Sequence, residues 1–429
     1  MRSLKTRLFM MCLVGIFLGA SLAFAGGPKE EVEKPKEVDV VLMHDKGGNP
    51  NFQPYFEETG QRTKQEIGVG ITPTPYPTTD VFIAAVRAAL PTEKAPELFT
   101  WWSTYRMKGL IDQGLVADLT EIWDNHADEY SKGLRDAFTF NGKNYGFVYG
   151  VEYWPVWYNK DVFAKLNLKE PQTWDELIQV CDTLKKNNVT PLFLTVQARW
   201  PTFIMFEEMI IGEDPDLYVD LCEGKAKYTD SRVKHAFKVW ADLMAKGYFT
   251  DPSTDLFSDA ARLFNQDKLA MVVCGTWFYT AVLTASGVPE EKIGAFILPS
   301  HNPKAGKNII LEAMPILVAE NAPNKKEAKM VADWLMGSEG NAFLAEKITS
   351  FPANQKSKAD YLPPVKVNLM NAIVNEKYNI LNRYWEATPT PICETAVDKF
   401  AEFILNPGSV DKVLADLDKI ADEYWAKSE

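Results

Sequence analysis

The sequence predicts an α/β protein of two domains, each built on a mostly parallel sheet flanked by helices. Apolar runs of strand length alternate with amphipathic segments of helix length from residue 38 onward, and this alternation is typical of sheets covered on both faces. The alternation starts again beyond Glu152. The chain has 429 residues, which is more than one hydrophobic core usually organises, at roughly 100–200 residues per domain.

The N-terminus has the pattern of an export signal. Three basic residues, Arg2, Lys5 and Arg7, precede an apolar run over 8–24, and a small-x-small cleavage site ends at Ala25. The run is short for a membrane span. A signal peptide that is removed on export is therefore favoured over an uncleaved anchor.

The segment after the signal, residues 26–36, consists almost entirely of charged residues, Gly and Pro. Such a segment cannot bury apolar surface, so we expect a flexible tether. The residue that follows the cleavage site is Gly26 and not Cys. A lipid anchor is therefore not expected, and the predicted location is the periplasm.

The first half of the chain shows three strands in order. Apolar runs at 38–43, 71–75 and 97–102 predict them. Between the last two runs, apolar residues at helical spacing predict a helix, and Thr79 or Asp80 is placed to cap it.

The second half shows a well-marked helix start. Thr173 and Glu176 form the capping-box pattern, which opens a helix that ends near Asn187. The other elements predicted here are strands at 190–195 and 270–274 and helices at 233–244, 324–336, 338–347 and 409–424.

The overall charge excludes two classes of partner. The formal net charge is −12, and the sequence contains no long basic run. Nucleic acids and anionic membrane surfaces attract basic patches, so neither is expected to bind. We expect a monomer whose ligand is a small molecule.

The cysteines and histidines give no pattern of a metal or cofactor site. Four cysteines follow the signal, without the CxxC spacing of redox and zinc motifs; they allow three pairings, and an exported protein permits either a disulfide or free thiols. The four histidines also lack ligand spacing, and the hydrolase and phosphate-binding motifs are absent. We predict no metal and no cofactor; the residues concerned are Cys181, Cys222, Cys274, Cys393, His44, His126, His235 and His301.

Aromatic and polar side chains gather directly after predicted strands. A sugar ring has an apolar face, which a flat indole can cover, and a rim of hydroxyls, which carboxylates and Arg can pair. Each buried polar group left unpaired costs about 1–3 kcal/mol. The Asp45 loop, Trp101-Trp102 and Trp277 all follow apparent strands, the position where α/β sheets bind ligands. This pattern favours a carbohydrate.

Several sequence blocks resemble the bacterial extracellular solute-binding proteins that serve sugar ABC importers. The run 141–161, with its NGKNYG and YNKD segments, resembles the family's first passage between lobes. The blocks at 264–277, 333–340 and 351–354 resemble later motifs, in the family's order. Together they spread over most of residues 40–355.

Several matches fall on positions that bind sugar in the maltose- and oligosaccharide-binding members. Residues 44–47 resemble a GDKG loop, and 101–106 resemble an FWAHDR stretch in which Tyr105 replaces a sugar-binding Asp. Glu152 matches a hinge Glu that bonds a sugar hydroxyl. A third aromatic platform near the C-terminus has no clear counterpart, and Trp385 is an alternative that the pattern does not favour. The ligand-binding residues that the resemblance implies are Asp45, Lys46, Asp80, Trp101, Trp102, Arg106, Glu152, Tyr153, Trp200 and Trp277.

The resemblance implies a two-lobed periplasmic-binding-protein fold, or Venus flytrap, with a hinge of two or three crossings. It places the N-terminal lobe at 37–150 plus 275–325 and the C-terminal lobe at 151–274 plus 326–429, after the signal peptide at 1–25.

The function implied is that of a periplasmic carbohydrate-binding protein and not an enzyme. It would capture a mono- or oligosaccharide between closing lobes and deliver it to the permease subunits of an ABC transporter. Two alternatives remain open: a secreted glycosidase or lyase, or the same fold binding a polyol, a glycerol phosphodiester or a peptide.

Overall fold

The computed structural model describes residues 38–48 and 53–427. These described residues belong to one compact unit. The predicted signal peptide at 1–25 and tether at 26–36 lie outside the described residues. None of the described helices combines the length and the apolar content that a membrane crossing requires.

The larger sheet has six strands, in the order β12-β11-β3-β1-β2, with β6 also paired to β11. β1 is parallel to β2 and β3, and β11 is parallel to β12 but antiparallel to β3 and β6. The strands predicted at the start of the chain are confirmed. The strands are β1 (Val38–His44), β2 (Val69–Pro75), β3 (Leu98–Thr100), β6 (Phe147–Tyr153), β11 (Asn308–Val318) and β12 (Asn379–Asn382).

The smaller sheet has the order β10-β7-β9-β8. Only β8 and β9 are parallel, and β7 is antiparallel to both of its neighbours. This sheet is therefore mixed and not mostly parallel, because β7 runs opposite to both β9 and β10. Its strands are β7 (Val156–Asn159), β8 (Thr190–Leu192), β9 (Leu269–Val273) and β10 (Ile293–Phe296); a separate hairpin pairs β4 (Thr139–Phe140) with β5 (Lys143–Asn144).

Helices pack against both sheets. α1, α12 and α13 pack together beside the larger sheet, and α2 contacts β1; α7, α11 and α14 contact β8, β9 and β10. The bounds are α1 (Gln53–Ile67), α2 (Thr79–Ala89), α7 (Trp174–Lys186), α11 (Ala260–Asn265), α12 (Lys325–Met336), α13 (Ser338–Ile348) and α14 (Pro364–Asn375).

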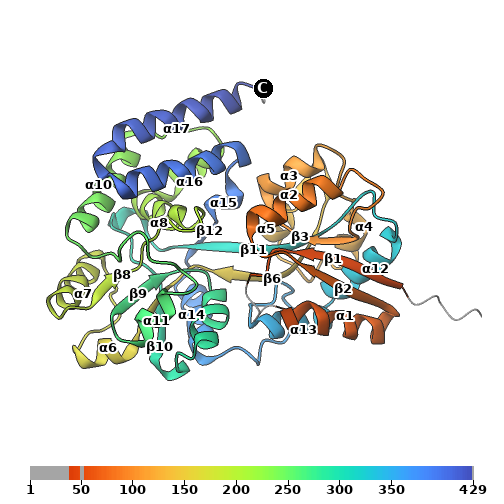
Figure 1. Cartoon of the computed structure of the whole chain (residues 1–429), viewed down its shortest axis with the longest axis horizontal. Coiled ribbons are helices and arrows are strands. Elements are labelled where there is room, and N and C mark those ends of the chain that lie inside the picture. The colour runs from red at the N-terminus through yellow and green to blue at the C-terminus, as the bar shows by residue number, and fades with distance from the viewer. Residues whose placement is uncertain (1–37, 49–52, 428–429) are drawn as a thin grey trace, which may run out of the picture. The chain divides into compact units, whose positions relative to one another are not determined.

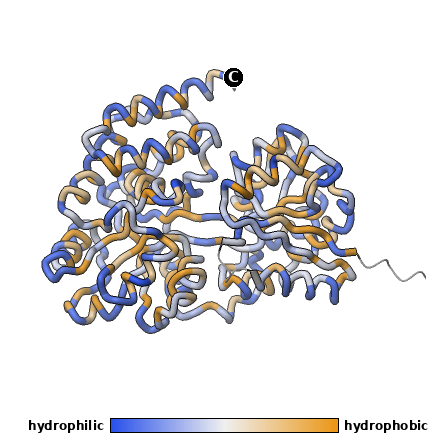
Figure 2. The backbone as a smooth tube through the Cα atoms, in the orientation of Figure 1, coloured by the Kyte–Doolittle hydropathy of each residue, from blue (hydrophilic) through white to orange (hydrophobic). Residues whose placement is uncertain are grey.

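A third group of helices surrounds α8 (Thr202–Glu213), all of whose residues are buried. A helix that is buried on every face must be enclosed by other elements, and α9, α10, α15 and α16 contact it. α17 packs on α16 and α10 with one apolar face, and Figure 2 shows orange and blue alternating along it. The bounds are α9 (Pro215–Cys222), α10 (Ser231–Ala245), α15 (Tyr384–Ala387), α16 (Thr390–Leu405) and α17 (Val410–Trp425).

Of the two helix N-terminal caps predicted from sequence, one is confirmed and one is displaced by a residue. The capping box of Thr173 and Glu176 is confirmed. The cap of α2 is Thr78 and not Thr79 or Asp80, because the Thr78 side chain accepts the Val81 N–H at 3.3 Å. The four cysteines within the described residues are free and buried. The remaining helices are α3 (Thr104–Ile111), α4 (Thr120–Asn125), α5 (Lys132–Asp136) and α6 (Lys160–Lys165).

The strand pairing departs from the lobe boundaries predicted after residue 275. β10 falls in 275–325, yet it pairs with β7 in the smaller sheet. α12, α13 and β12 fall in 326–429, yet they contact or join the larger sheet. The chain therefore passes between the sheets at other residues than predicted, and Figure 1 shows β6 and β11 extending between the two groups of elements.

Candidate functional site

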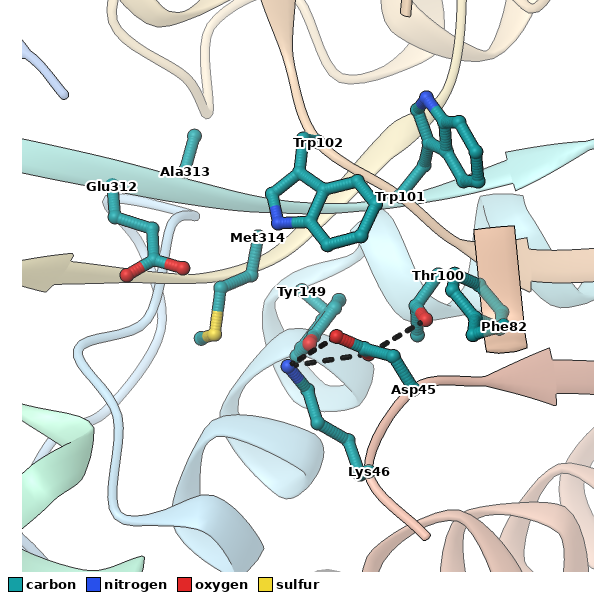
Figure 3. Close-up of a pocket in the computed structure, with 10 residues that line it drawn as sticks. All are labelled: Asp45, Lys46, Phe82, Thr100, Trp101, Trp102, Tyr149, Glu312, Ala313 and Met314. Carbon is teal, nitrogen blue, oxygen red and sulfur yellow. Dashed lines mark hydrogen bonds and ion pairs between the residues drawn. The ribbon is translucent and has the colours of Figure 1, made fainter. Parts of the chain in front are cut away.

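A small pocket of about 10 Å³ lies where β1 and β3 end. Ligands commonly bind at the carboxyl ends of such strands. The pocket brings together four of the predicted residues: Asp45, Lys46, Trp101 and Trp102. The full lining is Asp45, Lys46, Phe82, Thr100, Trp101, Trp102, Tyr149, Glu312, Ala313 and Met314 (Figure 3).

The polar side of the pocket is held by contacts between neighbouring strands. The Thr100 hydroxyl donates to Asp45 Oδ1 at 3.1 Å, and Lys46 Nζ lies 3.3 Å from the same carboxylate (Figure 3). Because Asp45 follows β1 and Thr100 ends β3, the parallel pairing of these strands sets the position of the carboxylate.

The apolar side is a pair of tryptophans. Trp101 Nε1 donates to the Arg106 carbonyl at 3.0 Å, which satisfies the polar atom of a buried ring. Trp102 lies 5.2 Å from Trp101 and 6.3 Å from Phe82 between ring centroids. Trp102 thus gives the pocket a flat aromatic wall opposite Asp45.

The sequence reasoning missed Glu312, which reaches the pocket from the middle of β11 (Figure 3). Its Oε2 lies 2.8 Å from Arg383 Nη1 and accepts the Trp277 indole N–H at 3.3 Å. The signal that could have found it is a single carboxylate within the apolar run NIILEAMPILV. Tyr149 on β6 and Met314 on β11 were missed as well.

A row of five rings leads away from the pocket. Each ring contacts the next in the order Trp102, Trp385, Phe203, Trp200 and Trp277. The distances between successive ring centroids are 6.3, 5.7, 6.0 and 6.2 Å. Trp200 and Trp277 are half-buried, and the other three are buried. The sequence did not favour Trp385 as a third aromatic platform. In the structure its ring lies between Trp102 and Phe203, and Phe203 in turn contacts the predicted Trp200.

Arg106 was predicted to bind hydroxyls, but its guanidinium is buried and already engaged. Its Nε donates to the Trp385 carbonyl at 3.0 Å, and Nη1 pairs with Glu394 at 2.9 Å. The guanidinium carbon also lies 3.5 Å from the centre of the Trp385 ring. Arg106 therefore holds Trp385 against Trp102.

Glu152 and Tyr153 are buried outside the pocket lining. Glu152 accepts the Thr276 hydroxyl and lies directly opposite Glu312 in the β6–β11 pairing. Burial raises the pKa of Glu152 and lowers the pKa of Lys366, and the attraction between the two charges reduces both shifts without cancelling them. The Tyr153 ring packs edge-on against Phe351 at 5.4 Å. Neither side chain offers its polar atoms to the pocket.

Asp80 lies in a second, larger and more open groove of about 250 Å³. Arg87 lines the groove from α2, and Thr390 and Glu394 line it from α16. The structure therefore separates Asp80 from the pocket of Asp45.

Glu208, in the enclosed helix α8, should make stability depend on pH. Burial raises the pKa of Glu208 to about 8, against an ordinary value of 4.5. Between these values the folded protein binds more protons than the unfolded chain, so the free energy of unfolding falls as pH rises from about 4.5 to about 8. Glu208→Gln should reduce this slope and stabilise the protein by up to about 4 kcal/mol at pH 8, as measured by urea unfolding at several pH values.

Glu121→Gln is the matched control, because Glu121 is exposed on α4. It should leave the slope unchanged. Equal pH profiles for wild type and Glu208→Gln would contradict a protonated Glu208.

Comparison with known proteins bears on the fold and on the class of protein. The model of a family described as bacterial extracellular solute-binding protein matches residues 58–369. An uncharacterized ABC transporter extracellular-binding protein of Pyrococcus horikoshii is 27% identical over 247 residues, which is 56% of this chain and 55% of that protein. The diacetylchitobiose-binding protein of Streptomyces coelicolor is 23% identical over 250 residues, which is 56% of this chain and 56% of that protein.

The chain thus spans about half the length of these curated relatives. Among solved structures, a bacterial solute receptor with a described preference for β-D-galactopyranose superposes with a TM-score of 0.82 at 18% identity. The superposition covers 91% of this chain and 99% of that one. At this identity the likeness establishes the fold.

Proposed function

The chain belongs to the bacterial extracellular solute-binding protein family, and on this premise we propose that it captures a mono- or oligosaccharide and delivers it to the permease of an ABC importer. Relatives and structural neighbours include proteins named for diacetylchitobiose and for β-D-galactopyranose. Export by a cleaved signal peptide, a periplasmic location and a monomeric state belong to the same proposal.

The observation that carries the proposal is the composition of the pocket. Trp102 supplies a flat apolar wall, while Asp45, Lys46 and Glu312 supply acceptors and donors around it. A sugar ring needs both kinds of surface, because its C–H face gains from aromatic burial and its hydroxyls must be paired. An apolar solute would leave the charged groups unpaired, and a polyanion would meet two carboxylates.

The proposed motion is a closure of two lobes around the sugar. We assign the larger sheet to one lobe and the smaller sheet with the α8 helices to the other. The crossings are then β6, β11 and the segment at Phe351, which bonds Val151. Closure would bring the Trp277 side of the aromatic row toward the Trp102 side.

The decisive experiment is a thermal-shift screen of the mature protein against mono-, di- and trisaccharides, with polyols and amino acids as controls. A ligand that binds only the folded state stabilises it by about 2.7 kcal/mol at 100 times its Kd. We expect a saccharide to raise the melting temperature and the controls to leave it unchanged. A shift with a polyol alone, or with no saccharide, would reject the carbohydrate assignment.

The same sample separates binding from catalysis. A binding protein returns its ligand intact, so chromatography after prolonged incubation should recover the added saccharide unchanged. Cleavage products formed in proportion to protein concentration would favour a secreted glycosidase or lyase instead.

A further inference from the structure

Two histidines and a carboxylate meet at the end of α8, although their spacing in the sequence predicted no metal site. Glu213 is the last residue of α8, His235 lies on α10, and His301 lies between β10 and β11. The spacing argument did not find them because they come from three separate segments. One ligand atom from each lies within 4.8 Å of the other two.

The three side chains converge on a single oxygen. Glu213 Oε2 lies 2.7 Å from His235 Nδ1 and 2.9 Å from His301 Nε2. Tetrahedral zinc, at about 2.0–2.1 Å from each ligand, needs its donor atoms about 3.3 Å apart. Small side-chain rotations that move these atoms apart by about half an ångström would therefore let a cation replace the two hydrogen bonds to Glu213.

Neighbouring groups hold two of the ligands in place. The Asn302 side chain donates to the Glu213 carbonyl at 2.8 Å, and its backbone N–H donates to Gly212 O at 3.0 Å. The ring of His301 packs against Trp174 at 5.4 Å. Such support reduces the rearrangement that binding requires.

Exposure differs across the cluster in the way a binding site requires. The side chains of His301 and Glu213 are 3% and 11% exposed, whereas His235 is 56% exposed. The cation can therefore enter from the His235 side, and water can occupy a fourth position there.

We propose that Glu213, His235 and His301 form a binding site for a divalent transition-metal ion, with Zn²⁺ as the first candidate. Two imidazoles and one carboxylate suit zinc and its neighbours, whereas Ca²⁺ and Mg²⁺ prefer oxygen ligands alone. The site lies at the opposite end of α8 from Trp200, roughly 18 Å away along a 12-residue helix. Glu213, His235 and His301 do not line the proposed sugar pocket, and a bound ion would join α8, α10 and the segment before β11.

The test is calorimetric titration of untagged, chelator-treated protein with ZnCl₂, with MgCl₂ as a parallel titrant. We expect one equivalent of Zn²⁺ to bind and Mg²⁺ to give no binding. His235→Gln removes one of the three ligands and should raise the Kd for Zn²⁺ by at least the roughly 10- to 100-fold that loss of an outer-shell partner costs. Because the His235 side chain is 56% exposed, the variant should keep its fold, which circular dichroism would verify.

His126→Gln is the matched control. His126 also contacts two carboxylates, Glu129 at 3.1 Å and Asp333 at 3.3 Å, but through opposite ring nitrogens, so the three groups cannot share one ion. This variant should bind Zn²⁺ like the wild type. Absence of Zn²⁺ binding, or an equal Kd in His235→Gln and wild type, would overturn the proposal, whatever the outcome of the sugar screen.

Discussion

Replacing Arg383 with Met should lower the free energy of unfolding by about 3–5 kcal/mol, because it leaves buried carboxylates unpaired. Arg383 is 5% exposed; it pairs with Glu312 at 2.8 Å, and its Nε donates to Glu386 at 2.9 Å. Met restores much of the volume of the side chain but none of its charge. Urea unfolding of the ligand-free protein measures the change.

Arg232→Met is the matched control for this prediction. Arg232 also pairs with two carboxylates, Asp214 at 2.7 Å and Asp230 at 2.9 Å, but its side chain is 44% exposed. Exposed pairs contribute about 0–1 kcal/mol. If the free energy of unfolding fell by a similar amount in the two variants, the burial of Arg383 and its carboxylate partners would not increase their contribution to stability.

Trp102→Ala should weaken saccharide binding about 30- to 150-fold. Removing the indole exposes about 100 Å² of sugar face, which at about 25 cal/mol per Å² corresponds to about 2–3 kcal/mol. The loss of the ring should also loosen Trp385, which packs edge-on against it. Calorimetric titration with the saccharide found in the thermal-shift screen measures the change in Kd.

Trp123→Ala separates loss of the pocket wall from loss of stability. Trp123 is fully buried, its indole N–H donates to Gly146 O at 2.8 Å, and it lies outside the pocket lining. Both substitutions should lower the melting temperature, but only Trp102→Ala should change the affinity. An unchanged affinity in Trp102→Ala would remove Trp102 from the binding site.

The elements with a regular pattern could be predicted from sequence. The capping box of Thr173 predicts α7, and the apolar stripe near the C-terminus predicts α17, because each signal is formed by residues within the helix itself. The pairing of β10 with β7 was not predictable in this way. It depends on which edge of β7 is left without a partner when the other strands have paired, and the residues of β10 alone do not contain this information.

The same distinction applies to the pocket. Asp45 and Trp102 could be predicted because each follows its strand directly. Arg106 has the right position in sequence, but its role depends on Trp385 and Glu394, which lie more than 250 residues away. The roles of Glu152 and Glu312 likewise depend on Lys366 and Arg383, which the sequence does not place beside them.

The position of β11 has a consequence for the order in which the protein can fold. Within the described residues, β11 is the strand that pairs with both β3 and β6, and it begins only at Asn308. A growing chain that has not yet reached β11 lacks the strand that joins β3 to β6. Pairing between strands so far apart in the sequence is slow to form. The polypeptide should therefore stay loosely organised until most of it has been synthesised, a state compatible with being threaded through a secretion channel.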